Sequence, residues 1–360
     1  MVAKLDEAAI RARLAEVSAQ GERITPPMID SIAVRDGLVH VALAIPRERA
    51  AALEPLRREA EAALGRIPGV TNASVVFTAH RQPAQAAPQA PPQPSQMMLS
   101  NVKSVIAVAS GKGGVGKSTV AVNLAAALAK RGLRTGLLDA DIYGPSLPRM
   151  LGVSRKPQMS GNMLMPIEAW GLLAMSIGFV VAEETAMVWR GPMVMNALQQ
   201  LMTQVAWPEL DAMVIDMPPG TGDVQLTLAQ RTRLAGAVVV STPQDIALID
   251  ARRGVSMFQQ VRVPVLGIVE NMSFFCCPNC NHRTDIFGHG GARAEAGRIG
   301  VPFLGEVPLL PAIRETSDAG TPITVSAPES EAARAFAAVA EKVAQAVAGP
   351  VRAGPRISIE

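Results

Sequence analysis

The chain has 360 residues, of which 49% are hydrophobic and 18% are charged. This is enough apolar material for more than one core, and the length favours two domains. The 34 basic and 31 acidic residues nearly balance, and no basic stripe or polybasic tail points to nucleic acid or an anionic membrane as a partner.

The N-terminus alternates charged and apolar side chains, so it lacks the continuous apolar core of a secretory signal peptide. No stretch of the chain reaches the roughly 18 uninterrupted apolar residues that a membrane-spanning helix needs. We therefore expect a cytoplasmic protein with neither a membrane nor nucleic acid among its partners.

Residues 1–80 are predicted to form a small α/β domain with two helices and three strands. Alternating apolar residues on both sides of Asp36-Gly37 indicate a β-hairpin. This part contains no obvious catalytic cluster. In chain order we expect a helix at Leu5–Val17, strands at Ser31–Val34 and Leu38–Ile45, a helix at Ala50–Leu64 and a strand at Ala73–Thr78.

A domain boundary follows this unit. Residues 82–96 read QPAQAAPQAPPQPSQ, and such a segment cannot build a core. Repeated proline favours an extended, semi-rigid tether, so we assign residues 81–99 to a linker. Residues 100–348 are predicted to form the second domain, and residues 349–360 a C-terminal tail.

The second domain is predicted to be a mostly parallel, doubly wound α/β sheet. Its strands are short and almost continuously apolar, which is typical of strands covered by helices on both faces. The expected strands are Ser104–Ala109, Thr135–Leu138, Ala212–Ile215, Ala237–Ser241, Val265–Val269 and Phe303–Gly305.

The sequence GKGGVGKS, residues 111–118, matches the P-loop pattern G-x-x-x-x-G-K-[ST] between a predicted strand and a predicted helix. Its glycines let backbone N–H groups converge on phosphate oxygens at a positive helix end. Lys117 is expected to reach the β- and γ-phosphates of ATP, and Ser118 to bind Mg²⁺; the alternative is a Gly-rich turn without function. The predicted phosphate-binding residues are Gly111, Lys112, Gly113, Gly114, Val115, Gly116, Lys117, Ser118 and Thr119.

Acidic residues after two other strands complete a hydrolytic site. Asp216 ends a short apolar strand, where a carboxylate of the Walker-B type holds Mg²⁺ through water. Asp139 and Asp141 follow another strand, and Asp141 is the better candidate to position the attacking water; either could instead cap the next element. The loop 218–223, with Gly220, is expected to sense the γ-phosphate through its backbone, or to be a Pro/Gly turn without a switching role.

The three cysteines of the chain are Cys276, Cys277 and Cys280, and their clustering favours metal or redox chemistry over a disulfide framework. Cys277 and Cys280 have the C-x-x-C spacing, whereas adjacent Cys276 is expected to be spare. Two thiolates do not complete a metal site, so a site built from sulfur alone requires a second chain across a two-fold axis. Zinc at that interface, zinc bound with His282 and His289, and a thioredoxin-like redox pair remain alternatives.

The first lysine of KGGVGKS, Lys112, resembles the signature lysine of the MinD/ParA/nitrogenase-iron-protein class of ATPases. The resemblance implies a homodimer that sandwiches ATP, with Lys112 acting on the nucleotide of the partner chain.

Over residues 103–325 the chain further resembles the Mrp/ApbC family of iron–sulfur cluster carriers. This resemblance implies a [4Fe–4S] cluster that Cys277 and Cys280 of two chains hold together, and a contact between Asn271 and adenine. Residues 1–80 resemble the small cluster-assembly domain often fused in front of such proteins, although the cysteine often seen there is absent. The motifs that carry the resemblance are DADIYGPSLPRMLG (139–152), SIGF (176–179), WRGPM (189–193), DMPPGTGDVQLTL (216–228), ENMSFFCCPNC (270–280), IFGHGG (286–291) and VPLLPAIRETSDAG (307–320).

The expected function is therefore that of an ATP-binding, slowly hydrolysing, homodimeric carrier that passes its cluster from donors to apo-protein acceptors. The catalytic candidates are Lys112, Lys117 and Asp141. A MinD/ParA-like spatial organiser without metal is the rival, and a nitrogenase-like electron donor is a third interpretation. The cysteine loop argues against the spatial organiser, and nothing in the sequence indicates the partner reductase that an electron donor would need.

Overall fold

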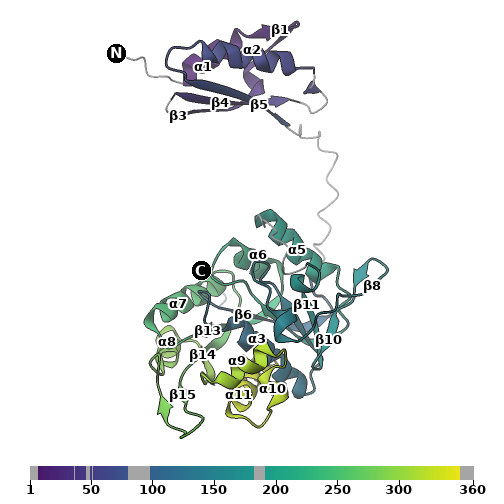
Figure 1. Cartoon of the computed structure of the whole chain (residues 1–360), viewed down its shortest axis with the longest axis vertical. Helices are drawn as coiled ribbons and strands as arrows, with labels where there is room; N and C mark the ends of the chain where they lie inside the picture. The colour runs from purple at the N-terminus through teal and green to yellow at the C-terminus, as the bar shows by residue number, and fades with distance from the viewer. Residues whose placement is uncertain are drawn as a thin grey trace, which may run out of the picture. The chain divides into compact units, whose positions relative to one another are not determined.

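The computed structural model describes residues 7–35, 37–45, 49–50, 52–79, 98–181 and 191–348. The chain divides into two compact units, Met1–Gln93 and Pro94–Glu360 (Figure 1). Outside the described residues lie Asp36 of the expected hairpin turn, residues 81–97 of the expected linker, Trp189 and Arg190 of the WRGPM motif, and the tail 349–360.

The small unit is a three-stranded sheet with two helices. The sheet order is β3-β4-β5; β3 and β4 are antiparallel, and β4 and β5 are parallel. The expected hairpin is therefore present, and Gly37 at its turn has a φ of +80°. The elements are α1 (Glu7–Ala15), β1 (Ser18–Ala19), β2 (Glu22–Arg23), η1 (Pro26–Met28), β3 (Ile29–Arg35), β4 (Leu38–Ile45), α2 (Glu54–Gly65) and β5 (Asn72–Ala79).

The core of the small unit follows from the two periodicities of its elements. Alternate residues of β4, from Val39 to Ile45, are buried, as are helix residues such as Ile10, Leu14 and Leu56. Polar side chains of α2 also hold the edge strand: Glu61 accepts a hydrogen bond from the Val75 N–H at 2.9 Å, and Arg57 donates one to its carbonyl at 3.2 Å. The edge of the sheet is thereby closed at this position.

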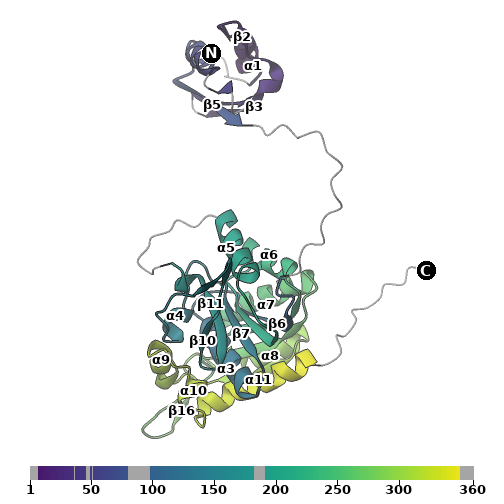
Figure 2. The same ribbon diagram turned by 90° about the vertical axis from the view of Figure 1, so that its right-hand side faces the viewer.

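An eight-stranded sheet forms the centre of the large unit, with the order β10-β11-β7-β12-β6-β13-β14-β17 (Figures 1 and 2). Every neighbouring pair is parallel except the antiparallel pair of β10 and β11. The strands are β6 (Val102–Ala109), β7 (Thr135–Asp139), β10 (Ile167–Ala169), β11 (Leu172–Ser176), β12 (Leu210–Asp216), β13 (Leu234–Ser241), β14 (Val265–Asn271) and β17 (Phe303–Val307).

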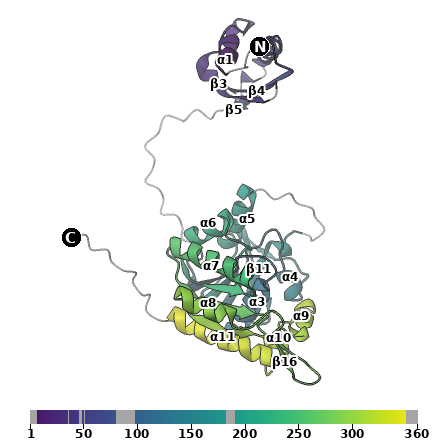
Figure 3. The same cartoon turned by 90° about the vertical axis from the view of Figure 1, so that its left-hand side faces the viewer.

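Helices cover both faces of this sheet, which is why its central strands are apolar along almost their whole length. In Figure 3, α5, α6, α7 and α8 follow one another down one side of the unit, whereas α3, α10 and α11 pack together in a separate layer. The helices are α3 (Lys117–Lys130), α4 (Leu147–Met150), η3 (Ile177–Phe179), α5 (Gly191–Thr203), α6 (Asp223–Arg231), α7 (Asp245–Gln260), α8 (Gly291–Ile299), α9 (Pro311–Asp318), α10 (Ile323–Ser326) and α11 (Glu331–Ala348).

The prediction of a small α/β domain followed by a mostly parallel sheet is confirmed. All six expected strands of the second domain are present, each extended by up to a few residues. Sequence reasoning missed β10 and β11, which add one antiparallel and one parallel strand beside β7. Two minor hairpins, β8 (Met159–Ser160) with β9 (Met163–Leu164) and β15 (Phe275–Cys276) with β16 (Arg283–Thr284), were not expected either.

Parallel strands send their carboxyl ends to one edge of a sheet, and ligands of open α/β sheets bind at that edge. The loops after β6, β7, β12, β14 and β17 therefore gather there, although they are far apart in sequence. These loops carry the predicted phosphate, acidic and cysteine motifs.

Candidate functional site

The P-loop joins the end of β6 to the start of α3, and its glycines are needed for two different reasons. Gly114 and Gly116 have φ angles of +82° and +79°, a region that other residues rarely adopt. A side chain at Gly111 would overlap the backbone of Asp250 on α7, and one at Gly116 would overlap the amide of Asn271. The loop is therefore tightly curved and closely packed, and its backbone stays accessible.

Lys117 and Asp216 form a buried ion pair beneath this loop. The Lys117 ammonium lies 2.5 Å from Oδ1 of Asp216 and 3.3 Å from the Ser118 hydroxyl. The two charged side chains are only 6% and 0% exposed. Removing one partner of such a pair leaves an uncompensated buried charge, so the pair holds the end of β12 against the P-loop.

The second oxygen of Asp216 supplies a test of the predicted Mg²⁺ site. Oδ2 is fully buried and has no hydrogen-bond partner among the described residues. A buried carboxylate oxygen without a partner is costly, and Mg²⁺ is held by carboxylates with several waters kept in place. The free oxygen of Asp216 therefore fits a hydrated Mg²⁺, and the Ser118 hydroxyl contacts the same Lys117 ammonium as Asp216 does.

Asp139 and Asp141 have different environments although both follow β7. Asp139 is buried, and its oxygens accept hydrogen bonds from the Asp141 N–H at 3.0 Å, the Ser146 N–H at 3.1 Å and the Ser176 hydroxyl at 3.0 Å. Burial, together with the charge of nearby Asp216, raises the pKa of Asp139 to about 7. Asp139 therefore acts as the cap of the turn into α4, which was the alternative left open for it.

Asp141 is only partly buried, and its carboxylate accepts hydrogen bonds from the backbone N–H groups of Tyr143 and Gly144 in the turn after β7. Burial raises the pKa of Asp141, whereas the positive charge of Lys117 opposes that rise. Asp141 thus lies in the electrostatic field of the Lys117–Asp216 pair, and the turn after β7 holds its carboxylate in place.

The loop after β12 is anchored to the P-loop. The Gly220 N–H donates to the carbonyl of Ser110 at 3.0 Å, and Gly220 has a φ of +96°. The Gln225 amide donates to the carbonyl of Pro218 from the start of α6. The structure thus places the expected γ-phosphate loop directly beside the phosphate-binding loop.

The side chain of Lys112 is half-exposed. Within the part of the chain that the structure describes, its ammonium has neither a carboxylate nor a hydrogen-bond partner. The free ammonium of Lys112 is available to a group outside this chain.

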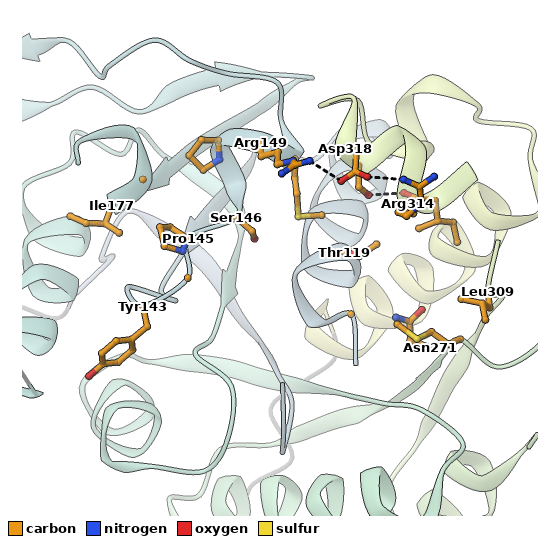
Figure 4. A pocket seen from close by; sticks show the side chains of 18 of the residues that line it. Thr119, Tyr143, Pro145, Ser146, Arg149, Ile177, Asn271, Leu309, Arg314 and Asp318 are labelled. Atoms are coloured by element: carbon orange, nitrogen blue, oxygen red, sulfur yellow. Dashed lines mark hydrogen bonds and ion pairs between the residues drawn. The ribbon is translucent and has the colours of Figure 1, made fainter. Parts of the chain in front are cut away.

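A cavity of about 910 Å³ opens beside the N-terminus of α3 (Figure 4). Its volume is near the upper end of the range for small-molecule sites. Asn271 lies in its wall and donates a hydrogen bond from Nδ2 to the carbonyl of Val115 in the P-loop at 2.8 Å. Thr119 of α3 also lines the cavity, and other walls come from the loops after β7 and β17 and from α9, including Tyr143, Pro145, Leu309 and Ile313.

Sequence reasoning identified Asn271 but did not single out Tyr143, Leu309 or Ile313. The signal for them was present, since Pro145 and Pro308 mark loops directly after two predicted strands. Such loops at the carboxyl edge of a parallel sheet are where ligand contacts concentrate.

Two arginines share one carboxylate at the rim of this cavity (Figure 4). Asp318 lies 2.9 Å from Arg314 on its own helix and 3.6 Å from Arg149 on α4. All three side chains are exposed, so the pairs contribute little to stability. They connect α4 and α9, which both line the cavity.

The cysteines occupy the tip of a short hairpin that begins four residues after β14. Its strands β15 and β16 pair Cys276 with Arg283, and the Cys277 N–H donates to the carbonyl of His282 at 3.0 Å. Cys276 and Cys277 are half-buried, whereas Cys280 is exposed. The hairpin therefore presents the C-x-x-C pair at the surface and holds Cys276 in its strand.

The C-x-x-C pair is not by itself a complete metal site. Hydrogen bonds from the backbone N–H groups of Cys280 and Asn279 hold the pKa of the Cys277 thiol below its ordinary value. Among the described residues no group of three or more His, Cys, Asp or Glu could hold a metal ion. His289, one alternative zinc ligand, instead contacts Glu306 at 3.1 Å.

None of the described helices is both long enough and apolar enough to cross a membrane.

Comparison with known proteins agrees with this geometry. Residues 101–344 match the family model described as NUBPL iron-transfer P-loop NTPase, and residues 7–75 match that of an iron-sulfur cluster assembly protein. An Escherichia coli relative called iron-sulfur cluster carrier protein is 49% identical over 87% of this chain and 84% of its own. An Arabidopsis thaliana iron-sulfur protein required for mitochondrial NADH dehydrogenase is 54% identical over 69% of this chain and 80% of its own.

Solved structures show the same fold. A nucleotide-binding protein from Archaeoglobus fulgidus, in complex with ADP, is 39% identical, with a TM-score of 0.58 over 66% of this chain and 94% of its own. The cell division ATPase MinD of Pyrococcus furiosus shares the fold at 23% identity, with a TM-score of 0.52 over 68% of this chain and 99% of its own. The resemblance to the iron–sulfur carriers is confirmed, and the chain belongs to the family of NUBPL-type iron-transfer P-loop NTPases, preceded by an iron–sulfur cluster assembly domain.

Proposed function

We propose that this protein is an ATP-binding and slowly hydrolysing carrier that holds a [4Fe–4S] cluster between two copies of the chain and transfers it to apo-proteins. One observation carries the proposal: a surface hairpin supplies two thiol ligands, with no third ligand beside them in the described chain, next to a complete P-loop. The same role is supported by the Escherichia coli relative, an iron-sulfur cluster carrier protein, and by a Mus musculus relative that is called an iron-sulfur cluster transfer protein.

In the proposed nucleotide site each residue has a separate task. Backbone N–H groups of the P-loop bind the phosphates at the positive end of α3. Lys117 exchanges its contact with Asp216 for the β- and γ-phosphates, and Asp141 positions the attacking water. Ser118 and the free oxygen of Asp216 hold Mg²⁺, which when bound offsets the charge of the phosphates.

Lys112 completes the site of the partner chain in this proposal. Lys112 is half-buried, and its ammonium has no partner among the described residues. A positive charge that reaches the γ-phosphate only in the dimer stabilises the transition state only there, as arginine fingers supplied in trans do. Hydrolysis is thereby coupled to the association of two chains.

The cluster is cargo rather than a resident cofactor. Cys277 and Cys280 of each chain supply the four thiolates that a cubane cluster requires. Because Cys280 is exposed, an acceptor protein can approach the cluster from solvent. The partners are then a second copy of the chain, cluster donors and apo-protein acceptors, in the cytoplasm.

A second candidate has the same ligands. Four thiolates from two chains also make a closed tetrahedral zinc site, which would leave an ATPase dimer held together by zinc. The protein should be purified without oxygen and reconstituted with iron and sulfide, and its iron, sulfide, zinc and mass measured. We expect about four irons per dimer. If the protein contains zinc and no sulfide, the zinc-held dimer becomes the favoured function in place of the carrier. If it contains no metal at all, a MinD-like organiser is favoured.

A further inference from the structure

Two chain segments separate the nucleotide cavity from the cysteine hairpin. Residues 271–274 run from the last residue of β14 directly into β15, and residues 307–310 begin at the last residue of β17. Both segments also contribute to the cavity wall, through Asn271 and Met272 from the first and Pro308, Leu309 and Leu310 from the second. The base of the hairpin is therefore built from residues that line the cavity.

Glu270, the residue before Asn271, fastens this junction from inside. Its side chain is 0% exposed, and Oε1 accepts hydrogen bonds from the Ser273 hydroxyl at 2.5 Å and the Gly290 N–H at 3.0 Å. Oε2 accepts from the Ala292 N–H at 2.7 Å, at the start of α8. A carboxylate at a helix N-terminus with three donors is strongly held, so Ser273 is attached to a fixed point.

On the nucleotide side, Asn271 is attached to the P-loop itself. Its amide donates to the carbonyl of Val115, and it fills the space that the missing side chain of Gly116 leaves. The next residue, Met272, has a φ of +54°. That conformation is unfavourable for methionine and persists only where the surroundings impose it. A shift of the P-loop that moves Asn271 should therefore change the backbone conformation at Met272.

On the hairpin side, backbone hydrogen bonds join the two segments. The Ser273 N–H donates to the carbonyl of Val307 at 3.0 Å, and the Leu309 N–H donates to the carbonyl of Phe274 at 2.7 Å. The Phe274 ring in turn lies 3.8 Å from the guanidinium carbon of Arg283 in β16. A continuous series of contacts thus runs from the P-loop to both strands of the hairpin.

From these contacts we infer that the Glu270–Ser273 pair, here called the brace, transmits nucleotide binding to the C-x-x-C hairpin. Glu270 and Ser273 are positioning residues: they face neither the phosphates nor the metal, and they set the geometry in which Cys277 and Cys280 are presented. Nucleotide binding displaces Asn271, and the brace converts that displacement into a change in how accessible the two thiols are. The inference deepens the proposed function, on which its biological meaning rests.

The test uses the full, metal-free chain with Cys276→Ser, so that only Cys277 and Cys280 react. Alkylation of the two thiols is followed by mass spectrometry with and without ADP and Mg²⁺. ADP is the probe because it lacks the γ-phosphate that Lys112 of a second chain is proposed to contact. The protein concentration is one at which light scattering gives the same mass in both samples. We expect ADP to change the alkylation rate by roughly fivefold, the lower end of couplings between sites.

Ser273→Ala removes the brace and leaves Glu270 with its two bonds to α8. We expect this variant to bind ADP with unchanged affinity while its alkylation rate no longer responds to ADP. Ser273→Thr keeps the hydroxyl and should keep the response. The matched control is Thr135→Val, which removes another buried hydroxyl, bonded to the carbonyl of Leu133, in β7, which three strands separate from β14.

A full response to ADP in folded Ser273→Ala, or no response in the parent chain, would overturn the inference. Loss of ADP binding by Ser273→Ala would also overturn it, because Ser273 would then belong to the nucleotide site. If Ser273→Ala does not fold, Glu270→Gln is measured in the same way. Because the thiols are assayed without metal, a response to ADP in a protein that never binds iron would refute the carrier function and leave the coupling intact.

Discussion

The P-loop and the cysteine hairpin both begin at the carboxyl edge of the same sheet, yet they are built in opposite ways. The P-loop region is closed within one chain: Lys117 is matched by Asp216, and both are buried. The hairpin is open. Its thiols have backbone contacts, Cys280 is exposed, and the described chain supplies no third ligand beside them.

This difference has a physical origin. Phosphates are bound by backbone N–H groups and by one lysine, which a single loop and helix can supply. A cubane cluster requires four thiolates, and a hairpin of this size presents two. We therefore expect nucleotide binding to be a property of one chain and cluster binding to be a property of two.

The largest expected effect separates the cysteines. After anaerobic reconstitution, Cys277→Ser and Cys280→Ser should lose essentially all of the about four irons per dimer, since each removes two of the four ligands. Cys276→Ser should keep its iron. All three variants should still bind ATP, because the hairpin contributes nothing to the Lys117–Asp216 pair. Equal iron loss in all three would place Cys276 in the site.

A reciprocal change is Lys117→Ala, which should lower ATP hydrolysis by at least about 100-fold and weaken nucleotide binding. It also leaves Asp216 buried without its partner. The free energy of unfolding should therefore fall by about 3–5 kcal/mol, and thermal unfolding should shift to lower temperature. Lys130→Ala, at the exposed end of the same helix, is the control. Hydrolysis at the parental rate by folded Lys117→Ala would contradict the P-loop assignment.

Lys112→Ala connects the two regions, because it removes a charge that acts only across the dimer. We expect hydrolysis to fall by at least about tenfold with ADP binding retained, since trans-acting charges are worth far more in the transition state than in binding. Mixing this variant with Lys117→Ala forms heterodimers with one intact site. An equal mixture should recover roughly a quarter of the parental activity, as random pairing of two chains requires. No recovery would mean that Lys112 acts within its own chain.

A smaller effect concerns the Cys277 thiol. Because N–H groups of Cys280 and Asn279 lower its pKa, its thiolate fraction at neutral pH exceeds that of an ordinary cysteine. In metal-free Cys276→Ser protein, alkylation of Cys277 should therefore reach its half-maximal rate below about pH 8.5. The same protein in urea is the control, since unfolding removes both N–H donors. Coincident pH profiles in the two states would contradict the effect.

The smallest effect is expected from removing the first unit. A chain that begins at Gln96 should fold, hydrolyse ATP and bind iron like the full chain, because a Pro-rich tether carries no structure that the second domain needs. Thermal unfolding, ATPase rate and iron content are compared with those of the full chain. Loss of folding would show that residues 1–80 form an integral layer. Reduced transfer to an acceptor, with all three unchanged, would give the first unit a docking role.

Local patterns in the sequence determined much of this protein. The P-loop is contiguous, so its eight residues imply the strand, the turn and the helix around it. The six predicted strands were recognised because buried parallel strands are apolar throughout, and the structure contains all six. The C-x-x-C pair was equally visible, and so was its incompleteness, since the chain has only one other cysteine.

The tertiary structure decided which distant residues meet. Asp216 lies 99 residues from Lys117 and contacts it because β12 and β6 are neighbours in the sheet. The same arrangement makes Asp139 a cap and places the Asn271 amide on the P-loop. Pairing of parallel strands and closure of buried hydrogen bonds depend on residues far apart in the chain, and no local pattern encodes them.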